Sequence, residues 1–309
     1  MWLQRALLPS GSCAMVEEKG KKPKRKFKYT IFLVVVCAIF YISIGQLGGE
    51  VLALSIADAL RGKWIPDAVI DNGLVYFAFI GIHISFLLYF LIFRRDLIRR
   101  FFYGYRNNNV RAFLIGLGIG FATNGFCILI AWLAGDIRFE TWIFSPWYFV
   151  LFLCVLIQSS AEELACRGFM YEVLIDNYHP VIAVLVNSLL FSALHAFNPG
   201  VKPIALVSIF LTGVEFSLMV YYFGSLWMAY AAHTMWNFTQ AFIFGLPNSG
   251  NPAGYAMLRL KFERDSVFYD TAFGVESTIT ALIADGLVCL VILYLIWRKK
   301  KNEQNSVTV

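Results

Sequence analysis

Residues 147–168 read WYFVLFLCVLIQSSAEELACRG, an almost wholly apolar run that ends in two adjacent glutamates followed closely by an arginine. Because charged side chains are costly within a bilayer, ionisable residues in a membrane segment are candidates for function. The run therefore predicts a transmembrane helix, and Glu162, Glu163 and Arg167 are the first candidates for a functional site inside it.

The composition of the whole chain agrees with a membrane location. Of its 309 residues, 59% are hydrophobic and 15% are charged, and the mean hydropathy is +0.66. A soluble domain is about a quarter charged, so these values favour an integral membrane protein, an all-α bundle of about eight transmembrane helices. The net charge of +6 comes mainly from basic residues beside the apolar runs, so we expect a lipid bilayer and no nucleic acid as partner.

Eight apolar runs are expected to cross the membrane. They cover approximately residues 30–44, 74–93, 112–134, 147–177, 180–197, 203–222, 225–246 and 277–297. We expect a disordered basic tail at 1–28, with Met15 as an alternative start to Met1. The bundle then occupies residues 29–300, and a short C-terminal tail follows at 301–309.

Basic segments alternate with acidic or neutral loops along the chain. The block Lys19–Lys28 has seven lysines and arginines, the segment after the second span has six arginines, and Arg298–Lys301 is wholly basic. Because basic loops remain in the cytoplasm, we expect both termini there, in the cell membrane if the source is prokaryotic.

A helical hairpin is expected to bring Glu162 and His195 to the same depth. Asn177 to Pro180 reads as its turn, and proline is favoured in the first turn of a helix. Glu162 lies fifteen residues before Asn177, and His195 lies fifteen residues after Pro180. At 1.5 Å per residue, both side chains lie ~22 Å from the turn on antiparallel helices.

A second hairpin, turning at Phe223 to Ser225, adds further polar groups. His233 and Asn237 are four residues apart and so share one face of a helix, ~13 and ~20 Å beyond the turn. Glu215 precedes the turn and reaches about the level of His233. We expect Glu215 either to pair with His233 or to face a water molecule inside the bundle.

These side chains form a set that suits peptide-bond hydrolysis without a covalent intermediate. A carboxylate and an imidazole can hold and deprotonate a water molecule. A second imidazole and an amide can stabilise the developing oxyanion. Arg167 is four residues after Glu163 and is better placed to pair with it than with Glu162. Glu163 and Arg167 are therefore interpreted as structural, and Glu162 as the base.

Three motifs of the chain resemble those of the CaaX protease and bacteriocin-processing (CPBP) family, whose best-known branch is the type II CaaX prenyl endopeptidase. They are Glu162-Glu163-x-x-x-Arg167, Phe191-x-x-x-His195 and His233-x-x-x-Asn237, within a core at about 147–246. Residues 223–227, 248–250 and 273–276 also resemble the prokaryotic branch. The resemblance implies an eight-helix glutamate-dependent intramembrane protease. In it Glu162 and His195 would activate water, and His233 and Asn237 would form the oxyanion hole.

Other functions remain open from the sequence. Glu162, His195 and His233 are an acceptable zinc ligand set, although no HExxH helix is present and the metal-free mechanism also uses Asn237. A bacteriocin-immunity or other peptide-binding protein would use the same bundle without catalysis. A proton-coupled transporter is disfavoured because no inverted repeat is found.

The substrate of a protease is also undetermined by sequence. A CaaX-type tail or a bacteriocin- or pheromone-like peptide fits equally, with cleavage expected from the cytoplasmic side. The oligomeric state is likewise undetermined.

Overall fold

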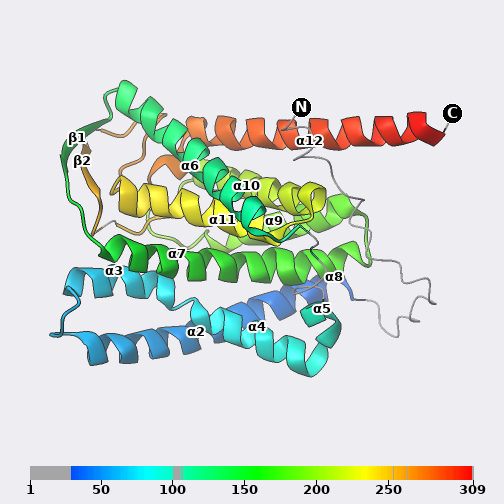
Figure 1. Ribbon diagram of the computed structural model, residues 1–309, viewed down its shortest axis with the longest axis horizontal. Coiled ribbons are helices and arrows are strands. Elements are labelled where there is room, and N and C mark those ends of the chain that lie inside the picture. The colour runs from blue at the N-terminus through cyan, green and yellow to red at the C-terminus, as the bar shows by residue number, and fades with distance from the viewer. Residues whose placement is uncertain (1–28, 100–104, 106, 253, 263, 308–309) are drawn as a thin grey trace.

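In a computed structural model, long helices lie side by side and are joined by short loops at both ends of the molecule (Figure 1). The structure describes residues 29–99, 105, 107–252, 254–262 and 264–307. The expected N-terminal tail at 1–28 lies outside the described residues. The all-α membrane bundle predicted from the sequence is confirmed.

The helical elements follow one another with few long loops. They are α2 (Ile31–Leu60), α3 (Asp67–Phe77), α4 (Ile80–Phe93), α5 (Arg95–Arg99), α6 (Val110–Leu133), α7 (Trp147–Glu163), the π-helix η2 (Leu164–Tyr171), α8 (Glu172–Ile175), α9 (Pro180–Leu194), α10 (Pro203–Phe223), α11 (Leu226–Phe238), the π-helix η3 (Thr239–Ile243), the 3₁₀ turn η4 (Val275–Ser277) and α12 (Ile279–Val307). Helix α12 thus continues through most of the expected C-terminal tail.

Six helical stretches within the described residues are long and apolar enough to cross a membrane. They are Ile31–Leu60, Asp67–Phe93, Val110–Leu133, Trp147–Ile175, Pro203–Phe223 and Ile279–Asn305. Helix α9 is apolar but shorter, and α11 is extended by η3. The count of eight spans stays a prediction.

The first helix is longer than the sequence predicts. A loop was expected at 45–73, but α2 continues to Leu60 and α3 begins at Asp67. Glycines and acidic residues in this stretch are typical of a loop, yet here the glycines form a packing face. An added Cβ at Gly45 would lie 2.6 Å from Ile82 Cα, and one at Gly49 would overlap the carbonyl of Ala78. Small residues let membrane helices approach in this way.

A two-stranded sheet, which the sequence analysis does not predict, closes one end of the bundle. Strand β1 (Ile137–Trp142) pairs antiparallel with β2 (Leu258–Phe262), in a register that joins Ile137 to Phe262 and shifts at a bulge after Phe139. The strands lie at the end opposite to the C-terminal end of α12 (Figure 1). More than a hundred residues separate them, so local sequence patterns do not reveal the pairing.

Both predicted hairpin turns are confirmed. Pro180 begins α9, and the His179 side chain accepts a hydrogen bond from the Val181 amide. Gly224, with φ of 61°, ends α10 in the left-handed region that glycine adopts without strain. Ser225 then caps α11 by accepting from the Met228 amide at 3.3 Å. The turns fix the depths of the polar residues further along each helix.

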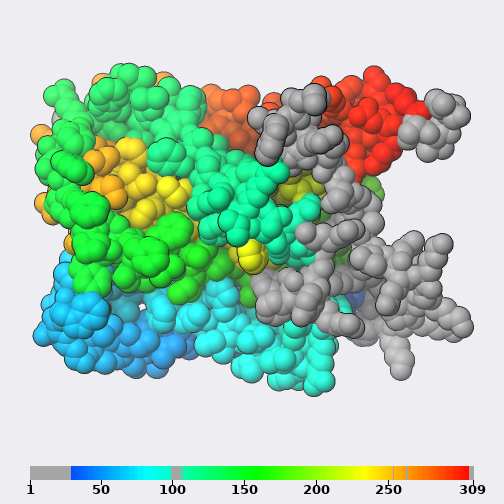
Figure 2. Space-filling view, in the orientation of Figure 1, coloured from blue at the N-terminus to red at the C-terminus, as the bar shows by residue number. Residues whose placement is uncertain are grey.

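Helix α11, which carries His233 and Asn237, lies between α6 and α7. Only parts of α11 are visible between these helices on the face drawn in Figure 2. Two glycines of α6 permit this closeness, since a Cβ at Gly116 would overlap the carbonyl of Met228, and one at Gly120 that of Ala232. The central position of α11 places its polar residues inside the bundle.

We predict that Gly49→Ala destabilises the bundle, by about 1–3 kcal/mol, because the added methyl group forces α2 away from α4. Thermal unfolding in detergent is the measurement. Gly48→Ala is the matched control, because a Cβ at Gly48 would meet no atom within 4 Å. Equal melting temperatures for the two variants would contradict the packing role of Gly49.

Candidate active site

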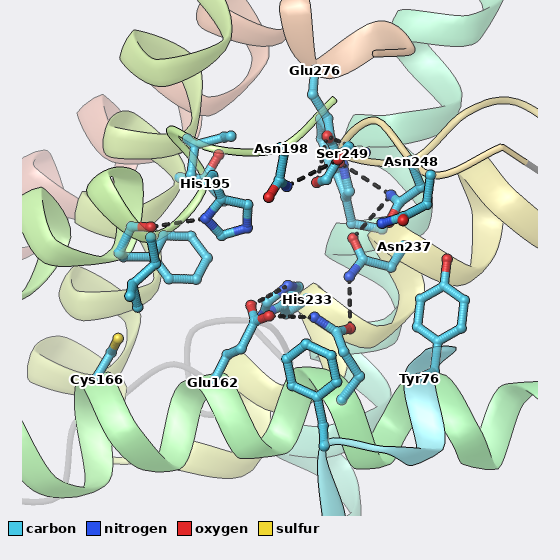
Figure 3. Close-up of a pocket in the computed structure, with 18 of the residues that line it drawn as sticks. Tyr76, Glu162, Cys166, His195, Asn198, His233, Asn237, Asn248, Ser249 and Glu276 are labelled. Atoms are coloured by element: carbon cyan, nitrogen blue, oxygen red, sulfur yellow. Dashed lines mark hydrogen bonds and ion pairs between the residues drawn. The ribbon is translucent and has the colours of Figure 1, made fainter. Parts of the chain in front are cut away.

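A cavity of ≈ 270 Å³ lies between the helices that carry the sequence motifs. All four predicted catalytic residues, Glu162, His195, His233 and Asn237, line it (Figure 3). They come from α7, the C-terminal end of α9 and α11. The cavity is also lined by mostly apolar residues of α2, α3, α4 and the turn between α3 and α4, which form its apolar wall: Ile42, Gln46, Val75, Tyr76, Phe79 and Ile82.

A fully buried ion pair lies beside the cavity. Arg167 Nη1 is 3.0 Å from Glu163 Oε1, and both side chains are completely inaccessible to solvent. Arg167 Nη2 also donates to the carbonyl of Gly213 on α10 at 2.7 Å. The predicted pairing of Glu163 with Arg167 is therefore present. It neutralises two charges that would otherwise be costly in the bundle.

His233 lies between the two glutamates. Its Nδ1 is 3.1 Å from Glu163 Oε1, and its Nε2 is 3.7 Å from Glu162 Oε2. A carboxylate only accepts hydrogen bonds, so Nδ1 carries a hydrogen toward Glu163. An Nε2 donor then requires the imidazolium form, whose charge the flanking carboxylates balance. Phe216 stacks on the ring with centroids 5.3 Å apart and fixes its plane.

The backbone carbonyl and the ring of Phe191, one turn earlier in the chain, orient His195. Its Nδ1 lies 2.8 Å from the carbonyl oxygen of Phe191, one turn earlier. A carbonyl accepts and does not donate, so Nδ1 carries the hydrogen and Nε2 is left as an acceptor. The Phe191 ring contacts His195 edge-on at 5.0 Å and His233 at 5.8 Å, and also lies 4.8 Å from the Arg167 guanidinium carbon.

Gln158 links Asn237 to Glu162. Asn237 Nδ2 donates to Gln158 Oε1 at 3.0 Å, and Gln158 Nε2 donates to Glu162 Oε1 at 2.7 Å. Gln158 is one helical turn before Glu162, on the same face of α7. It holds the carboxylate in one orientation and leaves Glu162 Oε2 beside His233. Sequence reasoning missed Gln158, although its spacing from Glu162 was a usable signal.

The loops at the end of the bundle that carries the sheet add a second group of polar residues. Glu276 Oε1 accepts from Trp236 Nε1 at 3.2 Å and from Asn248 Nδ2 at 3.1 Å. Its Oε2 accepts from the amide and the hydroxyl of Ser249, at 2.9 and 2.8 Å. Asn248 Nδ2 also donates to Asn237 Oδ1 at 3.2 Å, which turns the Asn237 donor toward Gln158 and the cavity. Burial raises the pKa of the Glu276 carboxyl, while these hydrogen bonds act in the opposite direction.

Residues 248–250 and 273–276 have no role in the site that the sequence alone predicts. No motif spacing links them to Asn237, because the contact runs between a loop and a helix. A glycine makes this loop contact possible: Gly274 has φ of 89°, and a Cβ there would overlap the carbonyl of Pro247.

Glu215 does not join this site. It is buried on α10, does not line the cavity and forms no ion pair with His233. The carboxylate that acts on it electrostatically is Asp285 of α12, which accepts a hydrogen bond from Thr212 at 2.6 Å. The predicted pairing with His233 is wrong because equal depth on two helices does not make their side chains face each other.

A family model described as type II CAAX prenyl endopeptidase Rce1-like matches residues 144–239. The matched segment runs from just before α7 to the start of η3 and contains all four predicted catalytic residues. Residues 144–239 of this chain are thus Rce1-like. The CPBP resemblance predicted from the three motifs is thereby confirmed, and the chain is a CAAX-type intramembrane protease in the general sense. None of the curated proteins and none of the solved structures compared with it gives a significant match.

The residues of the alternative zinc set, Glu162, His195 and His233, all line the cavity. Among the described residues, no group of three or more His, Cys, Asp or Glu side chains is arranged to hold a metal ion. His195 Nδ1 is held by a backbone carbonyl and His233 Nδ1 by Glu163, which leaves the Nε2 atom of each ring for a water molecule or a metal ion. The alternative zinc set of Glu162, His195 and His233 stays a hypothesis.

We predict that Glu163→Gln destabilises this Rce1-like protein, by about 3–5 kcal/mol, because it leaves the Arg167 charge buried without its partner. Unfolding in detergent is the measurement. Glu162→Gln is the matched control, since the Glu162 side chain is 15% exposed and belongs to no ion pair with an arginine or lysine among the described residues. Equal losses of stability in the two variants would contradict the special role of the buried pair.

Proposed function

We propose that the chain is an intramembrane endopeptidase in which Glu162 and His195 activate water to hydrolyse a peptide bond of a membrane-associated peptide or protein. The observation that carries the proposal is the meeting of these acceptors with the donors His233 and Asn237 in one cavity. The elements involved are separate in the chain, so local structure alone does not bring them together.

Water activation uses the two acceptors that face the cavity. Glu162 is held by Gln158 through Oε1, and His195 presents Nε2 because its Nδ1 donates to Phe191. A water molecule bound between them loses a proton to this pair as its oxygen attacks the scissile carbonyl carbon. No covalent bond forms between the enzyme and the substrate.

The oxyanion is stabilised by two oriented donors. One is the Asn237 Nδ2 group, whose orientation depends on Asn248. The other is His233 Nε2–H, available when the ring is charged and held by Glu163. Donors that are already oriented stabilise developing charge without reorganising in the transition state. When the tetrahedral intermediate collapses, the C–N bond breaks and the leaving amine takes up the proton held by the Glu162–His195 pair.

The apolar wall of the cavity suits a substrate that is itself apolar beside the scissile bond. Val75, Phe79 and Ile82 form part of this wall. A lipid-modified tail and a hydrophobic peptide both satisfy this requirement. This wall supports a membrane-associated substrate.

We predict that Glu162→Gln and His195→Ala each lower kcat by roughly 10²–10⁴-fold, because a general base is removed. Asn237→Ala is expected to lower kcat by about 10²–10³-fold through loss of an oxyanion donor. The assay is cleavage of quenched fluorescent peptides by the purified full chain in detergent, with unfolding curves recorded for each variant.

Glu215→Gln is the matched control, because it changes another buried glutamate that does not line the cavity. It should keep the parent activity. Peptide binding without cleavage, unchanged in Glu162→Gln, would contradict the proposal and favour a peptide-binding or immunity protein.

We also predict that a metal chelator leaves cleavage unchanged, because the proposed steps use only side chains and water. The purified chain is incubated with the chelator, dialysed and assayed with the same peptides. Loss of activity that added zinc restores would contradict the metal-free mechanism and reinstate the Glu162, His195 and His233 ligand set.

A further inference from the structure

Polar loop residues line the cavity at one end of the bundle, where Asn251 is exposed and His195 and Asn198 are half-buried, and we take this end as the mouth of the cavity. Its loop residues are Asn198 between α9 and α10, Asn248, Ser249 and Asn251 after η3, and Glu276 before α12. These loops are tied to one another, since Asn198 Nδ2 donates to the Ser249 carbonyl at 2.9 Å. Among the described residues, none that lines the cavity lies in the segments 94–109, 176–179 or 224–225 at the other end.

Helix lengths place the base of the cavity near mid-membrane and its mouth at this same end. Glu162 is fifteen residues from the start of α7 at Trp147 and thirteen from the end of α8 at Ile175, about 22 and 20 Å along the helical axis. His195 directly follows α9, at the end where the loop of Asn198 begins. The recess thus runs from Glu162 toward the loops that carry Asn248 and Glu276 (Figure 3).

The two ends of the bundle differ strongly in charge. Of the 26 lysines and arginines, 18 belong to the segments 1–28, 94–111 and 298–301, which along the chain precede α2, connect α4 to α6 and end α12. The described helix ends that adjoin these segments lie at the end of the bundle away from the mouth (Figure 1). Seven lie at the mouth end: Arg61, Lys63, Arg138, Lys202, Arg259, Lys261 and Arg264. The remaining one is the buried Arg167. Because lysine and arginine favour cytoplasmic loops, the end of the bundle whose helices these three segments flank faces the cytoplasm.

From the mouth and the charge distribution together, we infer that the cavity opens to the non-cytoplasmic side of the membrane. The substrate class that follows from this inference rests on the proposed function. The substrate is a peptide segment that has crossed the membrane or is exposed at its outer leaflet, such as an exported peptide or the outer part of an anchored protein. It replaces the expectation of cleavage from the cytoplasmic side.

The two observations behind this inference are independent of each other. The positions of Asn198, Asn248 and Asn251 come from the fold, whereas the basic segments are a property of the sequence. The depths of Glu162 and His195 below the hairpin turn predict a joint site but not the direction in which the cavity opens. Depth alone does not distinguish the two sides, because Glu162 is close to the middle of its span.

Sealed membrane vesicles of known orientation test the inference with the full chain. The probe is a quenched fluorescent peptide library with charged ends, which does not cross the bilayer. Right-side-out vesicles should cleave it without detergent, and inverted vesicles should gain at least tenfold in activity when detergent opens them. Activity confined to intact inverted vesicles would overturn the inference. No cleavage in either preparation after detergent would instead overturn the proposed function.

Cysteine labelling decides the orientation without any activity. In a Cys13→Ser background, Asn251→Cys is placed at the exposed mouth and Lys300→Cys at the other end as the matched position. The described native cysteines are buried or half-buried. A membrane-impermeant maleimide should label Asn251→Cys in intact cells and Lys300→Cys only after permeabilisation. The reverse pattern would overturn the inference whether or not the chain cleaves peptides.

Discussion

The buried ion pair between Glu163 and Arg167 is the constraint on which the rest of the site depends. Two charges without solvent contact must be neutralised by groups brought to them by the fold. Glu163 also accepts from His233 on α11, and Arg167 donates to Gly213 on α10. One electrostatic requirement therefore joins the helix of the first motif to two others. Glu162, one residue away from this fixed point, is held at a defined place beside the cavity.

Close helix packing makes that arrangement possible in a membrane, where apolar burial between helices supplies little driving force. The glycines of α2 and α6 let the neighbouring backbones approach to contact. Helix α11 is thereby pressed between α6 and α7, and its His233 and Asn237 face inward. The π-helix η2 directly follows Glu163 and carries Arg167, and η3 follows Asn237 within two residues. Such irregular turns are frequent at functional sites.

The loops at the end of the bundle that carries the sheet also orient the residues of the site. The Glu276 carboxylate accepts hydrogen bonds from Trp236, Asn248 and Ser249. Asn248 also donates to Asn237 Oδ1 and so orients the Asn237 amide. The orientation of the Asn237 amide is thus determined by residues at the mouth of the cavity. The same loops line the cavity at the end where, in the proposed function, a peptide enters. Positioning of the site and access to it are therefore two consequences of one loop arrangement.

The sequence alone determined the class of the protein, the two hairpin turns, the Glu163–Arg167 pair and the residues that meet in the cavity. These follow from composition and from short spacings along single helices, which are local properties. It did not reveal the full length of α2, because glycines that pack against α4 resemble those of a loop. Nor did it reveal Gln158, Asn248 and Glu276 as partners, the β1–β2 pairing, the isolation of Glu215 from His233 or the direction of the cavity. Only the tertiary structure decided these, because each depends on how segments far apart in the chain face one another.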